Sequence, residues 1–274
     1  MKTQSTISNS AAREKRASKR AQKKPALDEN HNHRDWAGTL LVGKGWLVFS
    51  GTSGDTDPHS HLLAQLVVGR NNAAVTVSFP DKLQSANRVF IPSGVEHQLE
   101  YSADIVDILY IDPTLSNISR TADDHITQSI ANNLFDVTME RQGSDFEIRQ
   151  LSSSQVDPRV LRAQKFINEH LVEEIPMQKV ADITNCSVSR LTVLMRQHTG
   201  LTFRQFVRWS RLSRAILSLA TTSSFTEAAH MGGFADAAHF SRTMREMFGV
   251  SPTEGLRHLN LTSSDLWPGM RNIV

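Results

Sequence analysis

The C-terminal part of the chain contains one pattern twice, and this internal repeat constrains the fold more than any other feature. Its positions recur at a constant offset: Leu191, Met195, Arg196, Gly200 and Thr202 correspond to Phe240, Met244, Arg245, Gly249 and Ser251. Apolar residues at helical spacing, followed each time by a glycine, predict a helical unit that occurs twice. Turn residues upstream, Asn185 and Gly233, predict that each unit is a helix, a short turn and a second helix. Two such units in tandem indicate DNA binding.

Three short motifs in the second unit carry a family resemblance. They are Gly233-Phe234, Phe240-Ser241-Arg242 and Gly249-Val-Ser-Pro252. With these motifs, residues 158–258 resemble the DNA-binding domain of AraC/XylS-type transcription regulators, in which a long helix joins two helix-turn-helix motifs. The resemblance implies that the units bind successive major grooves, and that the side chains facing DNA are Ser189, Arg190, Thr192, Val193, Arg196, Ala237, Ala238, Ser241, Arg242 and Arg245.

Val193 departs from the family pattern, which usually has an arginine at this position, as it does at Arg242. An arginine can hold guanine with two hydrogen bonds, worth about 1–3 kcal/mol of discrimination, whereas a valine can only touch a thymine methyl group. We therefore expect weaker recognition by the first unit.

Local signals in the second unit indicate where its helices begin and end. Ser224 followed by Glu227 predicts a capping box at the start of the first helix, and Gly233 is suited to close it. We expect Phe234 to be buried between the helices, and a second helix over about 236–247 to bury Phe240, Met244 and Met247. In the first unit the expected inward residues are Val180, Ala181, Ile183, Leu191, Leu194 and Met195.

The formal net charge of +2 hides an uneven distribution. Basic residues predominate in 1–24 and 155–260, whereas acidic residues predominate in 25–154. A basic C-terminal module suits the phosphate backbone of double-stranded DNA. On the expected connecting helix, candidate phosphate contacts are Arg204, Arg208, Arg211 and Arg214. Since the repeat has its own apolar anchors, we expect residues 155–274 to fold and bind DNA alone.

Between 34 and 113 the sequence has the two-residue period of strands. The strand-like runs are 38–42, 45–49, 63–68, 74–78, 88–91 and 105–110. Short strands separated by turn residues predict a small β-barrel or sandwich. The expected fold class is therefore α+β and multidomain, with an N-terminal barrel and a C-terminal, all-α, tandem helix-turn-helix domain.

Two fragments of the strand region, Pro58-His-Ser-His-Leu-Leu-Ala-Gln65 and Pro92-Ser-Gly-Val-Glu-His97, resemble the two cupin motifs. Many AraC-type regulators use such a small barrel as their sensor domain. Residues i and i+2 of a strand share a face, so His59 and His61 can both point into the barrel. The motif places Gln65 and His97 beside them, and we expect these four residues to bind a small-molecule effector.

The chemistry of this cluster has several readings. His59, His61 and His97 could bind Zn²⁺, Fe²⁺, Ni²⁺ or Mn²⁺, although Gln65 replaces the family's carboxylate with a weaker, neutral ligand. The same side chains could instead hydrogen-bond an organic effector without metal or other cofactor. A barrel that serves only for dimerisation is a further alternative. A metal-dependent cupin enzyme is the rival function, but Glu96 and Glu100 form no convincing acid/base pair, and we expect no enzyme.

These signals divide the chain into five segments. Residues 1–30 are a basic arm with too few apolar groups to order itself, and 31–115 are the cupin-like sensor barrel. Residues 116–156 hold a helix and a linker, 157–260 the DNA-binding domain, and 261–274 a C-terminal tail. Asp157-Pro158 is expected to start the first helix of the DNA-binding domain. An amphipathic helix over 123–139 would either form a homodimer or pack against its own barrel.

Composition suggests where the protein resides. The single cysteine, Cys186, permits no intramolecular disulfide, and no apolar run is long enough to cross a membrane. The N-terminus lacks the apolar segment of a secretory signal, so we expect a cytoplasmic protein with no membrane partner. The expected partners are double-stranded DNA and a small-molecule effector, with RNA polymerase and a second copy of the chain as further candidates. The effector, the operator and the direction of regulation are not encoded in these patterns.

Overall fold

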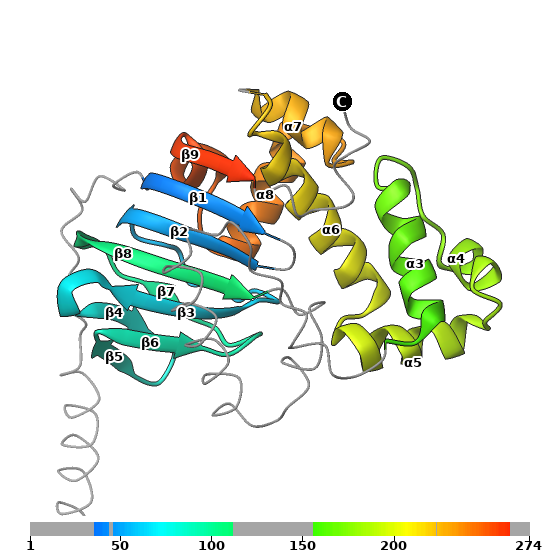
Figure 1. The fold of residues 1–274 in the computed structure, drawn as a ribbon, viewed down its shortest axis with the longest axis horizontal. Coiled ribbons are helices and arrows are strands. Elements are labelled where there is room, and N and C mark those ends of the chain that lie inside the picture. The colour runs from blue at the N-terminus through cyan, green and yellow to red at the C-terminus, as the bar shows by residue number, and fades with distance from the viewer. Residues whose placement is uncertain (1–35, 44–45, 112–155, 223, 264–274) are drawn as a thin grey trace, which may run out of the picture. The chain divides into compact units, whose positions relative to one another are not determined.

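Figure 1 shows the computed structural model, which describes residues 36–43, 46–111, 156–222 and 224–263. All of these residues belong to one unit that spans 34–274. The expected arm at 1–30, the amphipathic helix at 123–139 and the linker at 141–156, apart from Val156, lie outside the described residues. Among the described helices, none is long and apolar enough to cross a membrane.

The strands of the described residues form two sheets, with the orders β6-β3-β8-β2-β1-β9 and β5-β4-β7. All pairings are antiparallel except β1 with β9. Each expected strand run forms a strand, which together with the helical C-terminal part confirms the α+β fold class. The strands are β1 (Ala37–Gly43), β2 (Trp46–Ser53), β3 (Ala64–Gly69), β4 (Val75–Ser78), β5 (Leu83–Ala86), β6 (Arg88–Ile91), β7 (Gln98–Leu99), β8 (Ser102–Ile111) and β9 (His258–Ser263).

Burial along the strands follows their sequence. Every residue of β3 is buried, which matches its nearly continuous apolar run, whereas β4 alternates between buried and half-buried positions. Asp107 of β8 is a buried carboxylate, 2% exposed, and it accepts from Nε of Arg70 at 2.8 Å and from Nη2 of the same residue at 3.0 Å. This two-point pairing compensates for the burial of the charge.

The strand β9 crosses the predicted boundary between the DNA-binding domain, which was expected to end at 260, and a C-terminal tail. It runs parallel to β1, with Ala37 opposite His258 and Val42 opposite Ser263. Leu259 and Leu261 pack against the main apolar cluster. The C-terminal end of the DNA-binding segment is therefore part of the N-terminal sheet.

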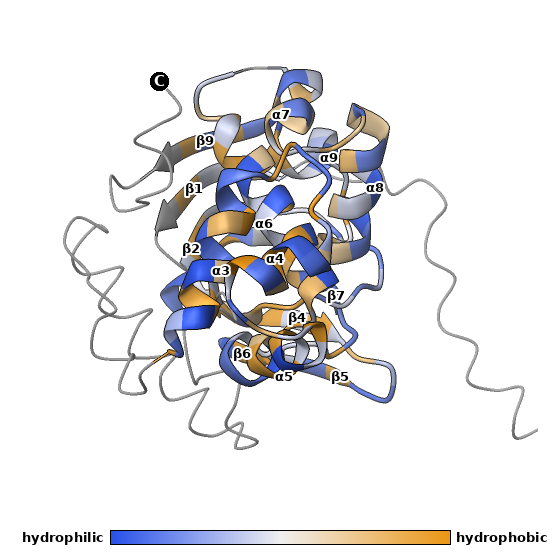
Figure 2. Ribbon diagram, turned by 90° about the vertical axis from the view of Figure 1, so that its right-hand side faces the viewer, coloured by the Kyte–Doolittle hydropathy of each residue, from blue (hydrophilic) through white to orange (hydrophobic). Residues whose placement is uncertain are grey.

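The helical part begins at α3, with Asp157 as its N-cap and Pro158 in its first turn, as expected. Its helices are α3 (Pro158–Glu169), α4 (Met177–Ile183), α5 (Val188–Thr199), α6 (Phe203–Ser218), α7 (Phe225–Met231), α8 (Ala237–Phe248) and α9 (Pro252–Leu256). Hydrophilic and hydrophobic residues both occur along the labelled helices in Figure 2, as amphipathic helices require.

The capping box expected at Ser224 and Glu227 is only half formed. The hydroxyl of Ser224 accepts from the backbone N–H of Glu227 at 3.2 Å, but the Glu227 carboxylate does not reach back to the Ser224 backbone. Thr222 links the two residues instead. Its hydroxyl accepts from the N–H of Ser224 at 3.2 Å and donates to the Glu227 carboxylate at 2.6 Å. The same orphan N–H is thus satisfied through an intervening hydroxyl.

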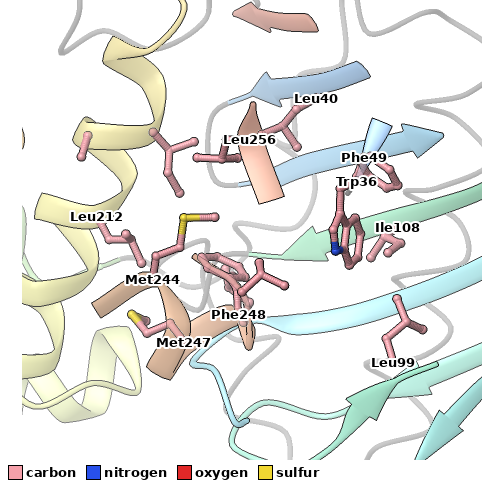
Figure 3. Packing of buried hydrophobic residues seen from close by; sticks show 14 of the residues in the cluster. Trp36, Leu40, Phe49, Leu99, Ile108, Leu212, Met244, Met247, Phe248 and Leu256 are labelled. Carbon is pink, nitrogen blue, oxygen red and sulfur yellow. The ribbon is translucent and has the colours of Figure 1, made fainter. Parts of the chain in front are cut away.

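The two helix-turn-helix units belong to different apolar clusters. The first unit, with α3 and the start of α6, forms a cluster of its own that includes Ile167, Leu191 and Phe206. The second unit shares one cluster with the strands, and Figure 3 shows Met244 and Phe248 in that cluster together with Leu40, Phe49 and Ile108. The second unit is therefore packed against the sheet region, whereas the first has a cluster of its own, against which Leu62 of the strand region packs.

Candidate functional site

The first helix-turn-helix unit consists of α4 and α5. Its turn contains Asn185 at φ 52°, a left-handed conformation that asparagine tolerates better than most residues. Val180 and Ala181 are buried as expected, but Ile183 is 41% exposed and was wrongly placed inside. The next residue, Thr184, takes the buried position, because its hydroxyl donates to the carbonyl of Val180 at 2.8 Å. The expected anchors on α5 are buried: Leu191, Leu194 and Met195.

The outer face of α5 is available to solvent. Val193 is 44% exposed, and the other residues named for DNA contact on this helix are exposed as well: Ser189, Arg190, Thr192 and Arg196. Nothing in the described residues covers this face.

The second unit consists of α7 and α8, joined by the expected turn. Gly233 has φ 79°, and Phe234 is buried with its ring centroid 5.4 Å from that of Phe240. A Cβ at Gly233 would collide with the carbonyl of Leu171, so both the positive φ and the lack of space require glycine here. Phe240, Met244 and Met247 are buried on the inner face of α8, as expected.

The outer face of α8 is only partly free. Ala238 and Arg242 are exposed, while Ala237 and Ser241 are half-buried. Arg245 is held by two carboxylates: its Nη1 donates to Asp57 at 2.6 Å and its Nη2 to Glu254 at 2.7 Å. The repeat makes Arg245 equivalent to Arg196, yet only Arg245 is engaged by the strand region.

The arginines of α6 differ in the contacts that they make within the protein. Arg204 is exposed, and Arg208 is paired with Glu246 of α8. Arg211 donates to the backbone carbonyls of Leu171 at 2.9 Å and Glu173 at 2.8 Å, so its guanidinium joins α6 to the segment after α3. A phosphate contact by Arg211 would therefore compete with this internal role.

His59, His61 and His97 converge, as the two motifs imply. Their ring centroids lie 4.3 to 5.5 Å apart, and one nitrogen from each lies within 4.8 Å of the others. All three are buried, as is Gln65, whose Oε1 lies 2.7 Å from Nε2 of His61 and 3.1 Å from Nε2 of His97. A backbone bridge between His59 and His97, with both N–H···O distances at 2.9 Å, fixes the two motifs side by side.

Each imidazole has a backbone carbonyl beside its Nδ1. The acceptors are Asp57 for His59 at 2.8 Å, Leu63 for His61 at 2.8 Å and Val95 for His97 at 2.9 Å. Burial is the main cause that lowers the pKa of each histidine to about 4, and the neighbouring histidines lower it further. The rings are therefore neutral at pH 7, and the single proton of each is best placed on Nδ1, where it donates to the carbonyl.

This tautomer has a consequence for the centre of the cluster. With Nδ1 protonated, each Nε2 presents a lone pair, and Oε1 of Gln65 adds an acceptor next to two of them. Converging acceptors attract either a cation or a ligand that donates hydrogen bonds. If the Gln65 amide were turned by half a rotation, its NH₂ group would donate one hydrogen to His61 and one to His97. The three nitrogens and the amide oxygen fit the ligand types that Zn²⁺ and related ions accept.

The comparisons with known proteins concern the helical segment. Residues 180–258 match the model of a helix-turn-helix domain. Over 99 residues the chain is 35% identical to the HTH-type transcriptional activator RhaS of Enterobacter sp. (strain 638), and 33% identical to RhaS of Salmonella schwarzengrund (strain CVM19633). The helical segment is an AraC-type helix-turn-helix domain. The resemblance expected from the motifs is thereby confirmed, while each alignment covers 36% of this chain and 36% of the relative, about a third of either length.

Solved structures were also similar. ToxT of Vibrio cholerae matches 77% of this chain and 97% of its own, with 11% identity and a TM-score of 0.49. An AraC-type DNA-binding domain of a transcriptional regulator from Chromobacterium violaceum matches 35% of this chain and 88% of its own, with 28% identity and a TM-score of 0.34.

The AraC-type domain touches the histidine cluster directly. The ring centroid of Phe248, at the end of α8, lies 6.0 Å from that of His61 and 5.7 Å from that of Tyr110. Gly249, the residue after α8, sits so close to the strand region that an added Cβ would lie 2.6 Å from Nδ1 of His59. The roles of Asp57, Tyr110 and Phe248 were not predictable from the sequence, because no local pattern brings α8 to residues 57–61. Gly200, which is equivalent to Gly249 in the repeat, is exposed, so the repeat itself does not indicate this contact.

Proposed function

We propose that this protein is a transcription regulator that binds specific DNA sequences with both helix-turn-helix units and responds to an effector at the histidine cluster. The observation that carries the DNA-binding part is the AraC-type domain with its two turns, the exposed outer face of α5 and the exposed Ala238 and Arg242 on α8. Ser189, Arg190, Thr192, Val193, Arg196, Ala237, Ala238, Ser241, Arg242 and Arg245 remain the proposed DNA contacts. We propose no enzymatic activity, since transcription regulation accounts for the domain that the comparisons identify.

The proposed sensor site comprises His59, His61, Gln65 and His97. Its occupant would bring a divalent cation or hydrogen-bond donors to the Nε2 lone pairs. A metal held there would supply a positive charge at the centre of three neutral imidazoles, and the carbonyls at Nδ1 would fix the ring orientations. Without one, an effector with two or more N–H or O–H groups would satisfy the same atoms.

Selection of bound duplexes from a random pool tests the DNA-binding part. Full-length protein should enrich one motif with two half-sites about one helical turn apart, which corresponds to successive major grooves. Adding cell extract should change the enrichment if a small molecule matters. Failure to enrich any sequence, by a folded and soluble protein at low salt, would refute the proposal.

Elemental analysis of the purified protein separates the two kinds of occupant. Stoichiometric Zn, Fe, Ni or Mn that is lost in His61→Ala would identify a metal site. Its absence, combined with a thermal-shift response to an organic compound that His61→Ala abolishes, would identify a metal-free effector site. A protein that shows neither response across a broad compound library would leave the histidine cluster without a sensing role and so contradict the proposal.

A further inference from the structure

We propose that Asp57 is an inhibitory clamp, which holds the second recognition helix against the sensor region and keeps Arg245 from DNA until the histidine cluster releases it. This inference rests on the proposed function and specifies how the sensor site regulates it. Three observations carry it: the contacts of Asp57, the position of His59 in the same segment, and the difference between the two halves of the repeat.

Asp57 contacts the end of α8 through both its backbone and its side chain. Its N–H donates to the carbonyl of Gly249 at 2.9 Å, and its carboxylate accepts from Nη1 of Arg245 at 2.6 Å. Glu254 binds the other side of the same guanidinium at 2.7 Å and is itself fixed by the N–H of Ser251 at 2.7 Å. Two carboxylates thus neutralise the arginine at the end of the second reading face.

Arg245 lies on the same face of α8 as Ser241, one turn earlier, and next to Arg242. A phosphate that approached this face would meet the carboxylate of Asp57, which is 46% exposed. The like charges would repel each other, so DNA can use Arg245 only after Asp57 has moved. The equivalent Arg196 of the first unit is exposed and faces no such carboxylate in the described residues. The clamp therefore acts on one of two otherwise repeated helices.

His59 connects the clamp to the sensor site. Its Nδ1 donates to the carbonyl of Asp57 at 2.8 Å, which leaves Nε2 as the nitrogen available to a ligand of the cluster. A ligand that binds Nε2 reorients the ring, and the Asp57 peptide follows through the Nδ1 hydrogen bond. Because Asp57 also binds Gly249 and Arg245, residues 57–59 would transmit the displacement from the histidine cluster to α8. The Arg245–Asp57 pair is half-exposed, and pairs of this kind are weak enough to be exchanged.

The test compares the DNA affinities of charge variants in the full-length protein. Asp57→Asn removes the clamping charge, and Asp104→Asn makes the same change in net charge on β8, at an exposed position away from α8. The probe is one mixed-sequence duplex of about four helical turns, measured by fluorescence anisotropy at fixed low salt. We expect Asp57→Asn to bind up to about fivefold more tightly than Asp104→Asn, the upper range for a half-exposed ion pair.

Two double variants test the mechanism. In Arg245→Gln the Asp57→Asn substitution should bring no gain, because the released side chain is missing. His59→Phe cannot donate to the Asp57 carbonyl. This substitution should raise the DNA affinity of the otherwise unchanged protein, but it should add nothing when Asp57→Asn is already present. Equal affinities of Asp57→Asn and Asp104→Asn, or additive effects in either double variant, would overturn the clamp while DNA binding itself stood. Absence of binding by every variant, including the wild type, would instead reject the proposed function.

Discussion

The ring of Phe248 lies against that of His61, with 6.0 Å between their centroids, so the last residue of the second recognition helix covers one side of the histidine cluster. Tyr110 completes the contact, since its ring centroid is 5.7 Å from each of the other two. Burial also raises the pKa of Tyr110 well above its usual value, which keeps the phenol neutral. A histidine of the cluster and the second helix of the second helix-turn-helix unit therefore share one aromatic contact.

Phe248→Ala should loosen this contact and admit water to the cluster. Truncation of a buried phenylalanine costs about 3–5 kcal/mol of unfolding free energy. Because burial is the main cause of the low pKa of His61, we also expect that pKa to rise from about 4 toward its usual value. Urea unfolding and an NMR titration of the imidazoles measure the two effects. A destabilised variant with an unchanged His61 pKa would show that Phe248 does not shield the cluster.

Gly249→Ala should destabilise the protein more than Gly94→Ala does. Both glycines have a positive φ, 69° and 78°, so both substitutions carry the backbone strain of about 1–2 kcal/mol. A Cβ at position 249 would in addition lie 2.9 Å from Cβ of Thr56, whereas nothing lies within 4 Å at position 94. Thermal unfolding of the two variants isolates the cost of close packing at α8. Equal losses would argue that the segment at 56–59 does not press on Gly249.

Stability should fall as the pH drops from about 6.5 toward 4. The three histidines take up protons near pH 6.5 in the unfolded chain but only near pH 4 in the folded one. The unfolded state therefore binds more protons in this window, which favours unfolding, and the effect disappears above it. Urea midpoints measured with a chelator present should show this loss in the wild type and a smaller loss in His61→Gln. A flat profile between these pH values would mean that the cluster is not buried.

Much of the helical domain was predictable because its signals are local. The caps at Asp157 and Ser224, the turn at Asn185 and the glycine at 233 each act on the residues beside them. Ile183 was misplaced because Thr184 satisfies its own hydroxyl inside the helix end, which a pattern of apolar residues does not register. The convergence of His59, His61, Gln65 and His97 followed from motif resemblance, since no local rule joins positions 61 and 97.

The contacts between the strands and the second unit were not predictable in this way. β9 pairs with β1 across more than two hundred positions of sequence, and Arg245 meets Asp57 over a similar separation. Such pairings depend on complementary surfaces that exist only after both regions have folded. An arginine on an outer helix face also carries the same sequence signal whether it meets a phosphate or a carboxylate.

The two reading faces should differ in their sensitivity to substitution. Arg242→Ala should weaken binding to a selected operator by about 1–3 kcal/mol if the guanidinium reads a base, whereas Val193→Ala should have little effect. Val193→Arg, on an exposed and uncovered face, should strengthen binding. Anisotropy titrations against the operator and single-base variants of it provide the readout, with circular dichroism to confirm folding. Similar losses of DNA affinity from Arg242→Ala and Val193→Ala would show that the proposed reading faces are wrong.

A fragment comprising residues 155–274 offers the strongest test of how the domains depend on each other. The sequence predicts that it folds alone, and the separate cluster around Leu191 supports this for the first unit. In the second unit, Met244, Phe248 and Leu256 pack in a cluster shared with the strands, so the fragment would expose them to water, and β9 would lose β1. We therefore expect the fragment to bind DNA through the first unit but to unfold at a lower temperature than the full-length protein and to aggregate. Adding Phe248→Ser should reduce aggregation of the fragment, although the same change destabilises the whole protein. A monomeric fragment that unfolds at the full-length temperature would show that the second unit does not need the sheet.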